Sequence, residues 1–346
     1  MQVVASGKAQ LHSAETGRMT KLLSIKGIRT EFGSGDKRVV AVDGVDLSVE
    51  RGATLGIVGE SGCGKSALSL SIMGLLPEAG KITGGQIIFD GQDIANASPR
   101  IMRSLRGKRI AMVFQEPMTS LNPLFTVGYQ ITEAMRAHDR SLSDRAARAK
   151  VIESLQRVRI PSPERRVDEY PHQMSGGMRQ RVMIAMALAC SPDLLIADEP
   201  TTALDVTVQA QILDLLRDLQ QQTGMAIILI THDLGVVAEM ADEIAVMYAG
   251  RVVERARTGE IFDNAQHPYT LGLLGSIPRI EENRDRLLAI EGAVPSPRSL
   301  PEGCRFHPRC VFAGSECRLQ DVRLLSVGED HVAACIRAPV ETVCVS

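Results

Sequence analysis

A phosphate-binding pattern, G-x-x-x-x-G-K-[ST], is matched by the eight residues Gly59-Glu60-Ser61-Gly62-Cys63-Gly64-Lys65-Ser66. The glycines let backbone N–H groups turn inward around the phosphates, Lys65 would reach the β- and γ-phosphates, and the Ser66 hydroxyl would ligate Mg²⁺. A solvated glycine-rich turn is the alternative, but a buried-strand pattern at 54–58 and a helical composition at 66–76 flank the loop. We therefore predict that nucleotide is contacted by Gly59, Ser61, Gly62, Cys63, Gly64, Lys65, Ser66 and Ala67.

Two adjacent acids follow a fully apolar run at 194–197. This arrangement places one carboxylate, Asp198, near Mg²⁺ and the next, Glu199, near an attacking water. An exposed acidic pair is the alternative, although such a pair would not normally follow a fully apolar strand. His232 ends another apolar run, 225–230, through Thr231. A single histidine is usually structural, but the position of this one beside the expected phosphate site favours a functional role.

A small anion site is indicated at Ser175-Gly176-Gly177, which begins a run rich in Met, Ala and Leu. A hydroxyl and unhindered N–H groups at a helix start attract negative charge. By themselves these three residues are more typical of a helix cap with flexible glycines.

The elements that must position these residues alternate between strand and helix patterns. Strand patterns occur in 22–50, 86–91, 111–114, 225–230, 244–248 and 251–254, the last two forming a hairpin. Helical composition extends from Thr126 to about Arg159, and a helix with Val208, Ile212, Leu215, Leu216 and Leu219 on one face stops at Gly224. The pattern predicts an α/β fold with a helical insert between the phosphate loop and the acidic strand.

Composition limits the class of protein. The chain has 346 residues, 44% of them apolar, and a net charge of −2, which gives no electrostatic reason to expect nucleic acid. No apolar run approaches the roughly 18–20 residues needed to cross a bilayer, and no secretory signal is recognised at the N-terminus. Residues 1–20 are expected to be a flexible tail.

Four of the seven cysteines lie near the C-terminus with the spacing C-x5-C-x6-C-x17-C, at Cys304, Cys310, Cys317 and Cys335. Four thiolates can hold zinc or an iron–sulfur cluster, and a chain without a secretory signal is expected to keep its thiols reduced. The wide gaps differ from the short C-x(2–4)-C pairs of zinc sites. A cluster, zinc and unligated thiols all remain open on spacing alone.

The order of these motifs resembles that of the ATP-binding cassette (ABC) ATPases. The similarity spans 22–257 and includes the phosphate loop, Gln115, the Ser-Gly-Gly segment, the acid pair, Ala203-Leu204-Asp205 and His232. The usual family signature is Leu-Ser-Gly-Gly-Gln, whereas this chain has Met174-Ser175-Gly176-Gly177-Met178, a form that looks like the peptide-importer branch. The segments 267–270 and 300–310 are similar to the C-terminal region of oligopeptide and dipeptide importer ATPases.

The resemblance implies a RecA-like P-loop core with an antiparallel β subdomain, a helical subdomain and a cysteine-containing extension. The implied boundaries are 21–257 for the ATPase domain, about 92–191 for its helical subdomain, and 258–346 for the extension.

The resemblance also implies roles for individual residues. Lys65, Gln115, Glu199 and His232 would be catalytic, with Glu199 as general base and His232 as γ-phosphate sensor. Mg²⁺ would be organised by Ser66, Gln115 and Asp198, and a 4Fe–4S cluster would be held by the four C-terminal cysteines. Further nucleotide contacts would come from Phe32, Ser175, Gly176, Gly177 and Asp205. An adenine-stacking Phe32 and a core or surface Phe32 are equally compatible with its position.

The implied partners are a second ABC ATPase chain in a heterodimer, two transmembrane permease subunits and, indirectly, a substrate-binding protein, with no nucleic acid. The implied location is peripheral, on the cytoplasmic face of the inner membrane. Dipeptides or oligopeptides are the expected cargo, while a nickel chelate, a glycoside or an opine remain alternatives. A soluble ABC ATPase acting on DNA or ribosomes would be expected to carry paired cassettes or basic arms, and a P-loop kinase would have no use for Ser175-Gly176-Gly177.

Overall fold

The computed structural model describes residues 21–114, 120–202, 204–277 and 290–340, with the side chain of Asp36 excepted. The predicted tail at 1–20 and the predicted site residue Gln115 lie outside the described residues. The strands are β1 (Lys21–Phe32), β2 (Val39–Glu50), β3 (Thr54–Val58), β4 (Gly80–Phe89), β5 (Gln92–Asp93), β6 (Ile110–Val113), β7 (Leu194–Asp198), β8 (Ala226–Thr231), β9 (Glu243–Tyr248), β10 (Arg251–Arg257), β11 (Leu325–Gly328) and β12 (His331–Ala333).

The helices connect these strands and extend the chain beyond them. They are α1 (Lys65–Met73), α2 (Pro99–Leu105), α4 (Val127–Arg136), α5 (Asp144–Arg157), α6 (Pro163–Arg166), α7 (Gly176–Leu188), α8 (Val206–Thr223), α9 (Leu234–Met240), α10 (Thr258–Asp263), α11 (Pro268–Gly275) and α12 (Glu316–Leu319). Short 3₁₀ turns occupy Gly35–Lys37, Pro171–Gln173 and His307–Arg309.

The strands form two sheets. One has the order β2-β1-β4-β5 and pairs antiparallel. The larger has the order β11-β12-β10-β9-β3-β8-β7-β6, in which β9, β3, β8, β7 and β6 run parallel. The expected α/β class and the predicted hairpin at 244–254 are confirmed, the latter as the antiparallel pair β9–β10.

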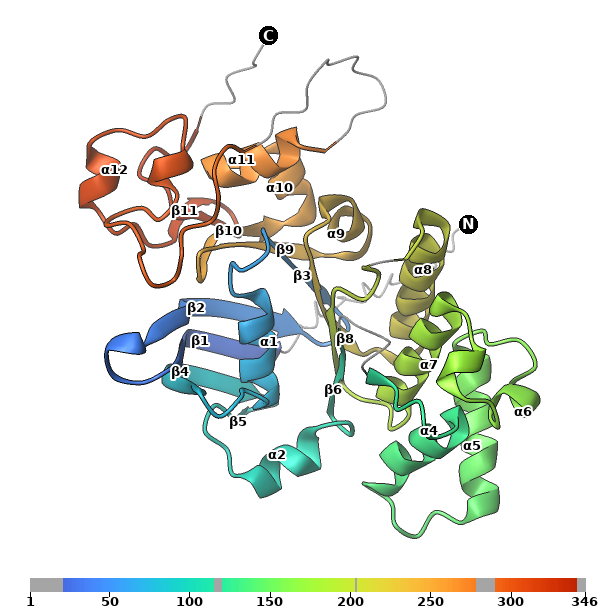
Figure 1. Ribbon diagram of the computed structural model, residues 1–346. Helices are drawn as coiled ribbons and strands as arrows, with labels where there is room; N and C mark the ends of the chain where they lie inside the picture. Colours follow the sequence, from blue (N-terminus) through green and yellow to red (C-terminus); the bar gives the residue numbers. More distant parts are fainter. Residues whose placement is uncertain (1–20, 115–119, 203, 278–289, 341–346) are drawn as a thin grey trace, which may run out of the picture.

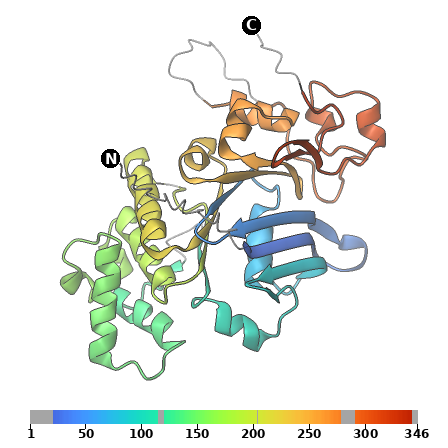
Figure 2. The ribbon, with the colours of Figure 1, turned by 180° about the vertical axis from the view of Figure 1, so that it is seen from behind.

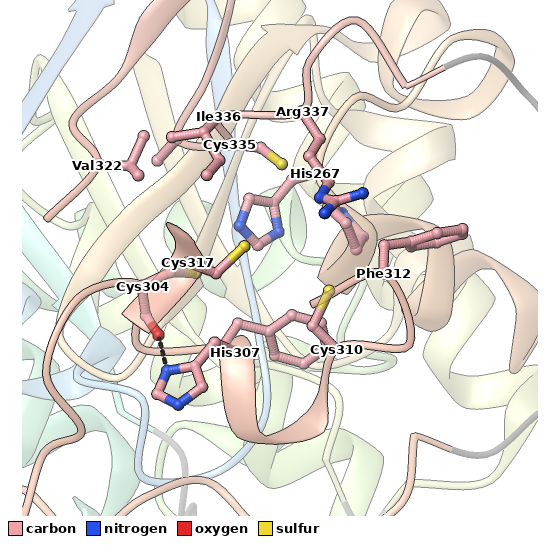
Figure 3. A pocket seen from close by; sticks show the side chains of 13 residues that line it. His267, Cys304, His307, Cys310, Phe312, Cys317, Val322, Cys335, Ile336 and Arg337 are labelled. Atoms are coloured by element: carbon pink, nitrogen blue, oxygen red, sulfur yellow. Dashed lines mark hydrogen bonds between the residues drawn. The ribbon is translucent and has the colours of Figure 1, made fainter. Parts of the chain in front are cut away.

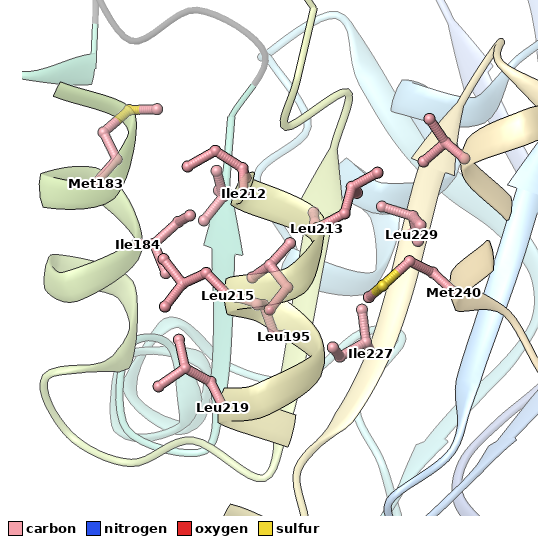
Figure 4. Close-up of a cluster of buried hydrophobic side chains, with 14 of the residues drawn as sticks. Met183, Ile184, Leu195, Ile212, Leu213, Leu215, Leu219, Ile227, Leu229 and Met240 are labelled. Atoms are coloured by element: carbon pink, nitrogen blue, oxygen red, sulfur yellow. The ribbon is translucent and has the colours of Figure 1, made fainter. Parts of the chain in front are cut away.

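The parallel strands are buried on both faces, which is why β7 and β8 read as uninterrupted apolar runs. Leu195, Ile227 and Leu229 pack against α7, α8 and α9, as Figure 4 shows. Ile196 and Ile228 face the opposite way, toward α1 and the antiparallel sheet. Both layers are visible in Figures 1 and 2, with α4, α5 and α7 grouped at the far end from the antiparallel sheet.

Some element boundaries differ from the sequence-based expectation. The helix after the phosphate loop ends at Met73, before Pro77, because Gly74 adopts a left-handed conformation that caps it. The helical stretch 126–159 is divided into α4 and α5, which are capped at their N-termini by Thr126 and Ser143. The predicted helical range 92–191 also contains β6, which pairs with β7 in the core sheet.

The C-terminal region continues the core sheet. Strand β12 pairs antiparallel with β10, and β11 pairs with β12. The fully buried Glu254 connects the two parts: its carboxylate accepts hydrogen bonds from the backbone N–H groups of Gln266 and His267 and lies 2.8 Å from the ring of His331. The boundary expected at 257/258 is therefore bridged by strand pairing and by a buried carboxylate.

Candidate ATP site

The sheet order brings three of the predicted motifs to one edge. Because β3, β8 and β7 are parallel neighbours, their carboxyl ends lie side by side, with Val58 opposite Thr231 and Asp198 opposite Ile230. The phosphate loop follows β3, the acid pair ends β7, and His232 follows β8. The carboxyl edge of a parallel sheet is where α/β proteins bind ligands.

The phosphate loop is shaped by close contacts that only glycine permits. A Cβ at Gly59 would lie 2.2 Å from the carbonyl oxygen of Met247, and a Cβ at Gly64 would lie 2.4 Å from that of Ala41. Gly64 also has a φ of +107°, a left-handed value that favours glycine. Lys65 is 5% exposed, and its Nζ donates to the carbonyl oxygens of Gly59 (2.6 Å) and Glu60 (3.1 Å). The ammonium group is thus held inside the loop.

Asp198 has the environment expected of a magnesium ligand. It is 5% exposed, its Oδ2 accepts a 3.4 Å hydrogen bond from Ser69, and its Oδ1 is buried without a hydrogen-bond partner among the described residues. Burial raises the pKa of Asp198, against the opposing effects of Ser66 and Lys65. A buried, unpartnered carboxylate oxygen beside a serine hydroxyl fits a divalent cation that prefers oxygen ligands. The contribution of Ser69 carried no signal in the sequence.

Glu199 and His232 lie next to each other. Glu199 Oε1 is 3.4 Å from His232 Nδ1, and Glu199 Oε2 accepts a 2.8 Å hydrogen bond from Thr202. Glu199 has a φ of +48°, an uncommon value for a residue other than glycine, and its backbone N–H donates to Ile230 on β8. The glutamate side chain is 15% exposed and the histidine 60% exposed, so the histidine is open to solvent. Sequence analysis did not identify Thr202.

The Ser175-Gly176-Gly177 segment lies on the α4–α5–α7 side of the molecule, away from α1 (Figure 1). Ser175 is exposed and caps α7 by accepting a hydrogen bond from Met178 N–H. A Cβ at Gly177 would meet Val208 at 2.9 Å, while Asp205 caps α8 by accepting from Val208 N–H at 2.9 Å. The N-termini of α7 and α8 therefore pack against each other. The N-terminus of α7, which can attract an anion, is exposed at Ser175.

Phe32 ends β1 and is half-buried. Its ring lies over Gly80, where a Cβ would come within 2.7 Å of Cε1. The ring of Phe32 thus packs where β1 ends beside the start of β4. Adenine stacking by Phe32 stays a prediction. Two further motif residues, Gln115 and Ala203, lie outside the described residues.

The four C-terminal cysteines line one pocket together with His267 and Phe306. In Figure 3 the sulfur atoms of Cys310, Cys317 and Cys335 face a common space. Burial raises the pKa of the thiols of Cys304 and Cys335, and that of Cys310 to about 11.

This pocket does not form a site for a single metal ion. Within the described part of the chain, no group of three or more His, Cys, Asp or Glu is placed to hold one. A tetrahedral zinc needs its sulfur atoms about 2.3 Å from one point, whereas a cubane cluster bonds each thiolate to a different iron and so keeps them farther apart. Backbone N–H groups near Cys304, Cys310 and Cys335 oppose the rise in the thiol pKa, but burial outweighs them. The four thiols therefore share a pocket, and a cluster there stays a prediction.

Among the helices the structure describes, none is long and apolar enough to span a membrane.

Comparisons with known proteins cover most of the chain. A family model for the ABC transporter matches residues 42–202, and one for the oligopeptide/dipeptide transporter C-terminal region matches residues 253–317. The chain is 53% identical over 293 residues to the dipeptide transport ATP-binding protein DppD of Bacillus subtilis, covering 84% of this chain and 87% of that protein. It is 48% identical over 314 residues to the DppD protein of Escherichia coli, covering 91% and 96%.

Solved structures show the same core. A dimeric ATP-binding cassette in a post-hydrolysis state bound to ADP and Pi aligns with a TM-score of 0.62 and 28% identity, covering 68% of this chain and 98% of that one. A cassette from Clostridium perfringens, part of an ABC transporter complex, aligns with a TM-score of 0.61 and 30% identity, covering 70% and 90%.

Proposed function

Because the chain belongs to the family of ABC transporter ATP-binding proteins, which are ATPases, we propose that it powers the import of dipeptides or oligopeptides. Its proposed site is the edge where the phosphate loop, the acid pair and His232 meet. The peptide assignment rests on two relatives that are named as dipeptide transport proteins and that match most of this chain.

Within the site, Lys65 and the loop amides, with Gly59, Ser61, Gly62, Cys63, Gly64 and Ala67, would hold the nucleotide phosphates. The ammonium of Lys65 would exchange its bonds to loop carbonyls for bonds to phosphate oxygens. Ser66 and Asp198 would ligate Mg²⁺, with Gln115 as a further ligand, and Mg²⁺ would neutralise charge on the phosphates. The unpartnered Oδ1 of Asp198 supports this assignment.

Glu199 would act as the general base toward the attacking water, since it is held by Thr202 and lies beside His232. His232 would contact the γ-phosphate from its exposed position. Phe32 would stack on the adenine, and Asp205 would lie near the nucleotide through its cap on α8. Positioning and charge stabilisation would supply most of the rate enhancement.

A second ATPase chain would complete each site, in a heterodimer. Ser175, Gly176 and Gly177 are exposed or half-exposed and lie apart from the phosphate loop of their own chain, so they would cap the γ-phosphate held by a partner subunit. The dimeric state of a similar cassette bound to ADP and Pi supports this arrangement. Two permease subunits would form the membrane channel, a substrate-binding protein would deliver the peptide, and the chain would associate peripherally with the cytoplasmic side of the membrane.

We further propose a 4Fe–4S cluster held by Cys304, Cys310, Cys317 and Cys335. Their shared pocket and the backbone N–H groups near Cys304, Cys310 and Cys335 support it. When bound, the cluster would supply a rigid cross-link between segments far apart in sequence. Protein purified anaerobically is expected to contain iron and labile sulfide in about equal amounts, which Cys310→Ser loses and the control Cys190→Ser retains. Stoichiometric zinc without iron would contradict the cluster.

The function is tested by reconstitution. The chain, its partner ATPase and the permease subunits in proteoliposomes are expected to accumulate a labelled dipeptide when supplied with Mg²⁺-ATP and the substrate-binding protein. Uptake of a nickel chelate or a glycoside in place of the dipeptide would reassign the cargo. Absence of any ATP-dependent uptake, with intact assembly, would reject the importer assignment.

A further inference from the structure

One contact joins the cysteine-bearing segment directly to the phosphate loop. The guanidinium of Arg309 forms a two-point ion pair with the carboxylate of Glu60, the second residue of the loop, with Nη1–Oε2 at 2.6 Å and Nη2–Oε1 at 2.9 Å. Arg309 is 5% exposed and Glu60 is 31% exposed. Paired N–H···O bonds of this kind are the strongest type of charge-assisted contact between side chains.

The rest of the guanidinium is fixed by the surrounding structure. Nε donates to the carbonyl oxygen of Glu291 at 2.9 Å, Nη2 donates to that of Ile290 at 3.2 Å, and the group lies over the rings of Tyr248 and Phe306. Its hydrogen bonds to Glu60 raise the pKa of Arg309. An arginine held on so many sides restricts the carboxylate that it binds.

Glu60 is held at its backbone as well. Its N–H donates to the Tyr269 hydroxyl at 2.9 Å, and its carbonyl oxygen accepts from Lys65 Nζ at 3.1 Å. Tyr269, like Arg309, belongs to the C-terminal region and is fully buried, packed against Tyr248 and Phe306. The side chain, the N–H and the carbonyl of Glu60 are thus each held by a contact. The C-terminal region supplies the contacts to the side chain and to the N–H.

A second arginine of the same segment reaches the neighbourhood of the loop. Arg305 donates to the carbonyl oxygen of Ala249 at 2.6 Å and pairs with Asp43. The N–H of the next residue, Gly250, donates to the carbonyl oxygen of Cys63 in the loop at 2.8 Å. Arg305 and Arg309 lie between Cys304 and Cys310, so this segment presents sulfurs to its pocket and guanidinium groups to the ATP site.

We propose that Arg309 is a positioning residue of the ATP site, which neutralises Glu60 and holds the first half of the phosphate loop in its ATP-accepting form. An unpaired carboxylate in this loop would place a negative charge close to the triphosphate, and like charges at such distances repel each other. The C-terminal region would therefore control nucleotide affinity, in addition to any role in holding metal. This inference rests on the phosphate-loop assignment proposed above.

The test measures binding of a fluorescent ATP analogue with Mg²⁺ to the full-length chain. Arg309→Met removes the charge and keeps most of the side-chain volume, and it is expected to raise the Kd about tenfold, by analogy with other like-charge contacts. Adding Glu60→Gln to this variant removes the unpaired charge and is expected to restore the Kd to within about threefold of the wild type. In the assembled transporter the loss is expected in KM, with kcat changed less than about twofold.

Two observations separate this role from simple attachment of the C-terminal region. The difference in Kd between Arg309→Met and the wild type is expected to shrink as salt is raised, because salt screens the partly exposed Glu60. The control Arg257→Met breaks a different ion pair, 3.5 Å to Asp330 in the C-terminal hairpin, and is expected to leave the Kd unchanged.

The proposal is overturned if Arg309→Met binds ATP like the wild type, or if the double variant binds as weakly as the single one. If Arg309→Met fails to fold, Arg309→Lys and the double variant provide the test. A double variant that binds ATP much more weakly than the wild type overturns the proposal. Lys65→Ala identifies a different failure: if that variant binds ATP normally, the phosphate-loop assignment itself is wrong.

Discussion

Glu199 combines a left-handed backbone conformation with side-chain contacts to Thr202 and His232. A strained residue is retained only where its surroundings enforce it, and such residues gather at functional sites. Glu199 directly follows β7 and His232 directly follows β8, so the two side chains meet at the carboxyl edge of the sheet.

Replacing Glu199 with Gln is expected to leave ATP affinity within about twofold and to slow hydrolysis about 100-fold or more, because the amide cannot accept a proton. The measurement is phosphate release by the assembled transporter under saturating Mg²⁺-ATP. The exposed Glu239→Gln on α9 is the matched control and is expected to turn over normally. Normal turnover by Glu199→Gln would remove its assignment as general base.

Asp198 is predicted to be required for magnesium. Asp198→Asn keeps the shape of the side chain but removes the charge, so the Mg²⁺ concentration that gives half-maximal hydrolysis is expected to rise at least about tenfold. A titration of ATPase activity with Mg²⁺ at fixed ATP measures this. The neighbouring Ser69→Ala loses a 3.4 Å hydrogen bond to Asp198 and a 2.9 Å hydrogen bond to the carbonyl oxygen of Ser66, but no charge, and is expected to shift the midpoint by less than about threefold. Equal midpoints for Asp198→Asn and wild type would exclude the aspartate as a ligand.

At the scale of elements, the C-terminal region depends on a histidine that burial keeps neutral. His267 is 1% exposed, its Nδ1 accepts a hydrogen bond from Tyr269 N–H at the start of α11, and burial lowers its pKa to about 3. The unfolded chain binds a proton near pH 6.5, whereas the folded chain does not until about pH 3. The contribution of neutral His267 to the free energy of unfolding is therefore fully present above pH 6.5 and is lost as the pH falls toward 3.

Between pH 7 and pH 5 the free energy of unfolding is expected to fall by about 2 kcal/mol through this group, at 1.4 kcal/mol per pH unit below 6.5. Urea unfolding at the two pH values measures the change. His267→Asn keeps a cap on α11 without a titrating ring. Between pH 7 and pH 5 its free energy of unfolding is therefore expected to fall by about 2 kcal/mol less than that of the wild type. The same pH dependence in both proteins would show that another group causes the loss.

At the scale of the whole molecule, the segment Ser175-Gly176-Gly177 at the start of α7 lies apart in space from the phosphate loop before α1 (Figures 1 and 2). Ser175 is exposed at the start of α7, so a bulky charged side chain there is expected to fit the isolated chain and to block the nucleotide of the proposed partner subunit. The proposed second ATPase subunit is the consequence of this separation.

Ser175→Arg is expected to leave ATP binding by the isolated chain within about twofold, while phosphate release by the assembled transporter falls about tenfold or more, because the arginine occupies the inter-subunit site. Binding titration and phosphate release measure the two effects. The control is Ser299→Arg, an exposed serine in the C-terminal region. Weakened ATP binding by the isolated Ser175→Arg chain would place the signature at the chain's own nucleotide.

The sequence by itself determined the motifs, their order and most of the elements that carry them. Local patterns suffice there: the apolar runs of β7 and β8 are buried on both faces, and the Gly-Lys-Ser loop can be recognised without its surroundings. Boundaries were less well predicted where a single capping residue decides them, as at Gly74.

Only the tertiary structure decided which distant residues meet. Ser69 beside Asp198 and Arg309 on Glu60 are contacts across 129 and 249 positions, and no periodicity or spacing indicates them. The longer of these depends on packing of the C-terminal region against the core through β12 and Glu254. Side-chain contacts of this kind arise from how whole elements are placed, and that placement is a property of the folded chain rather than of any local segment.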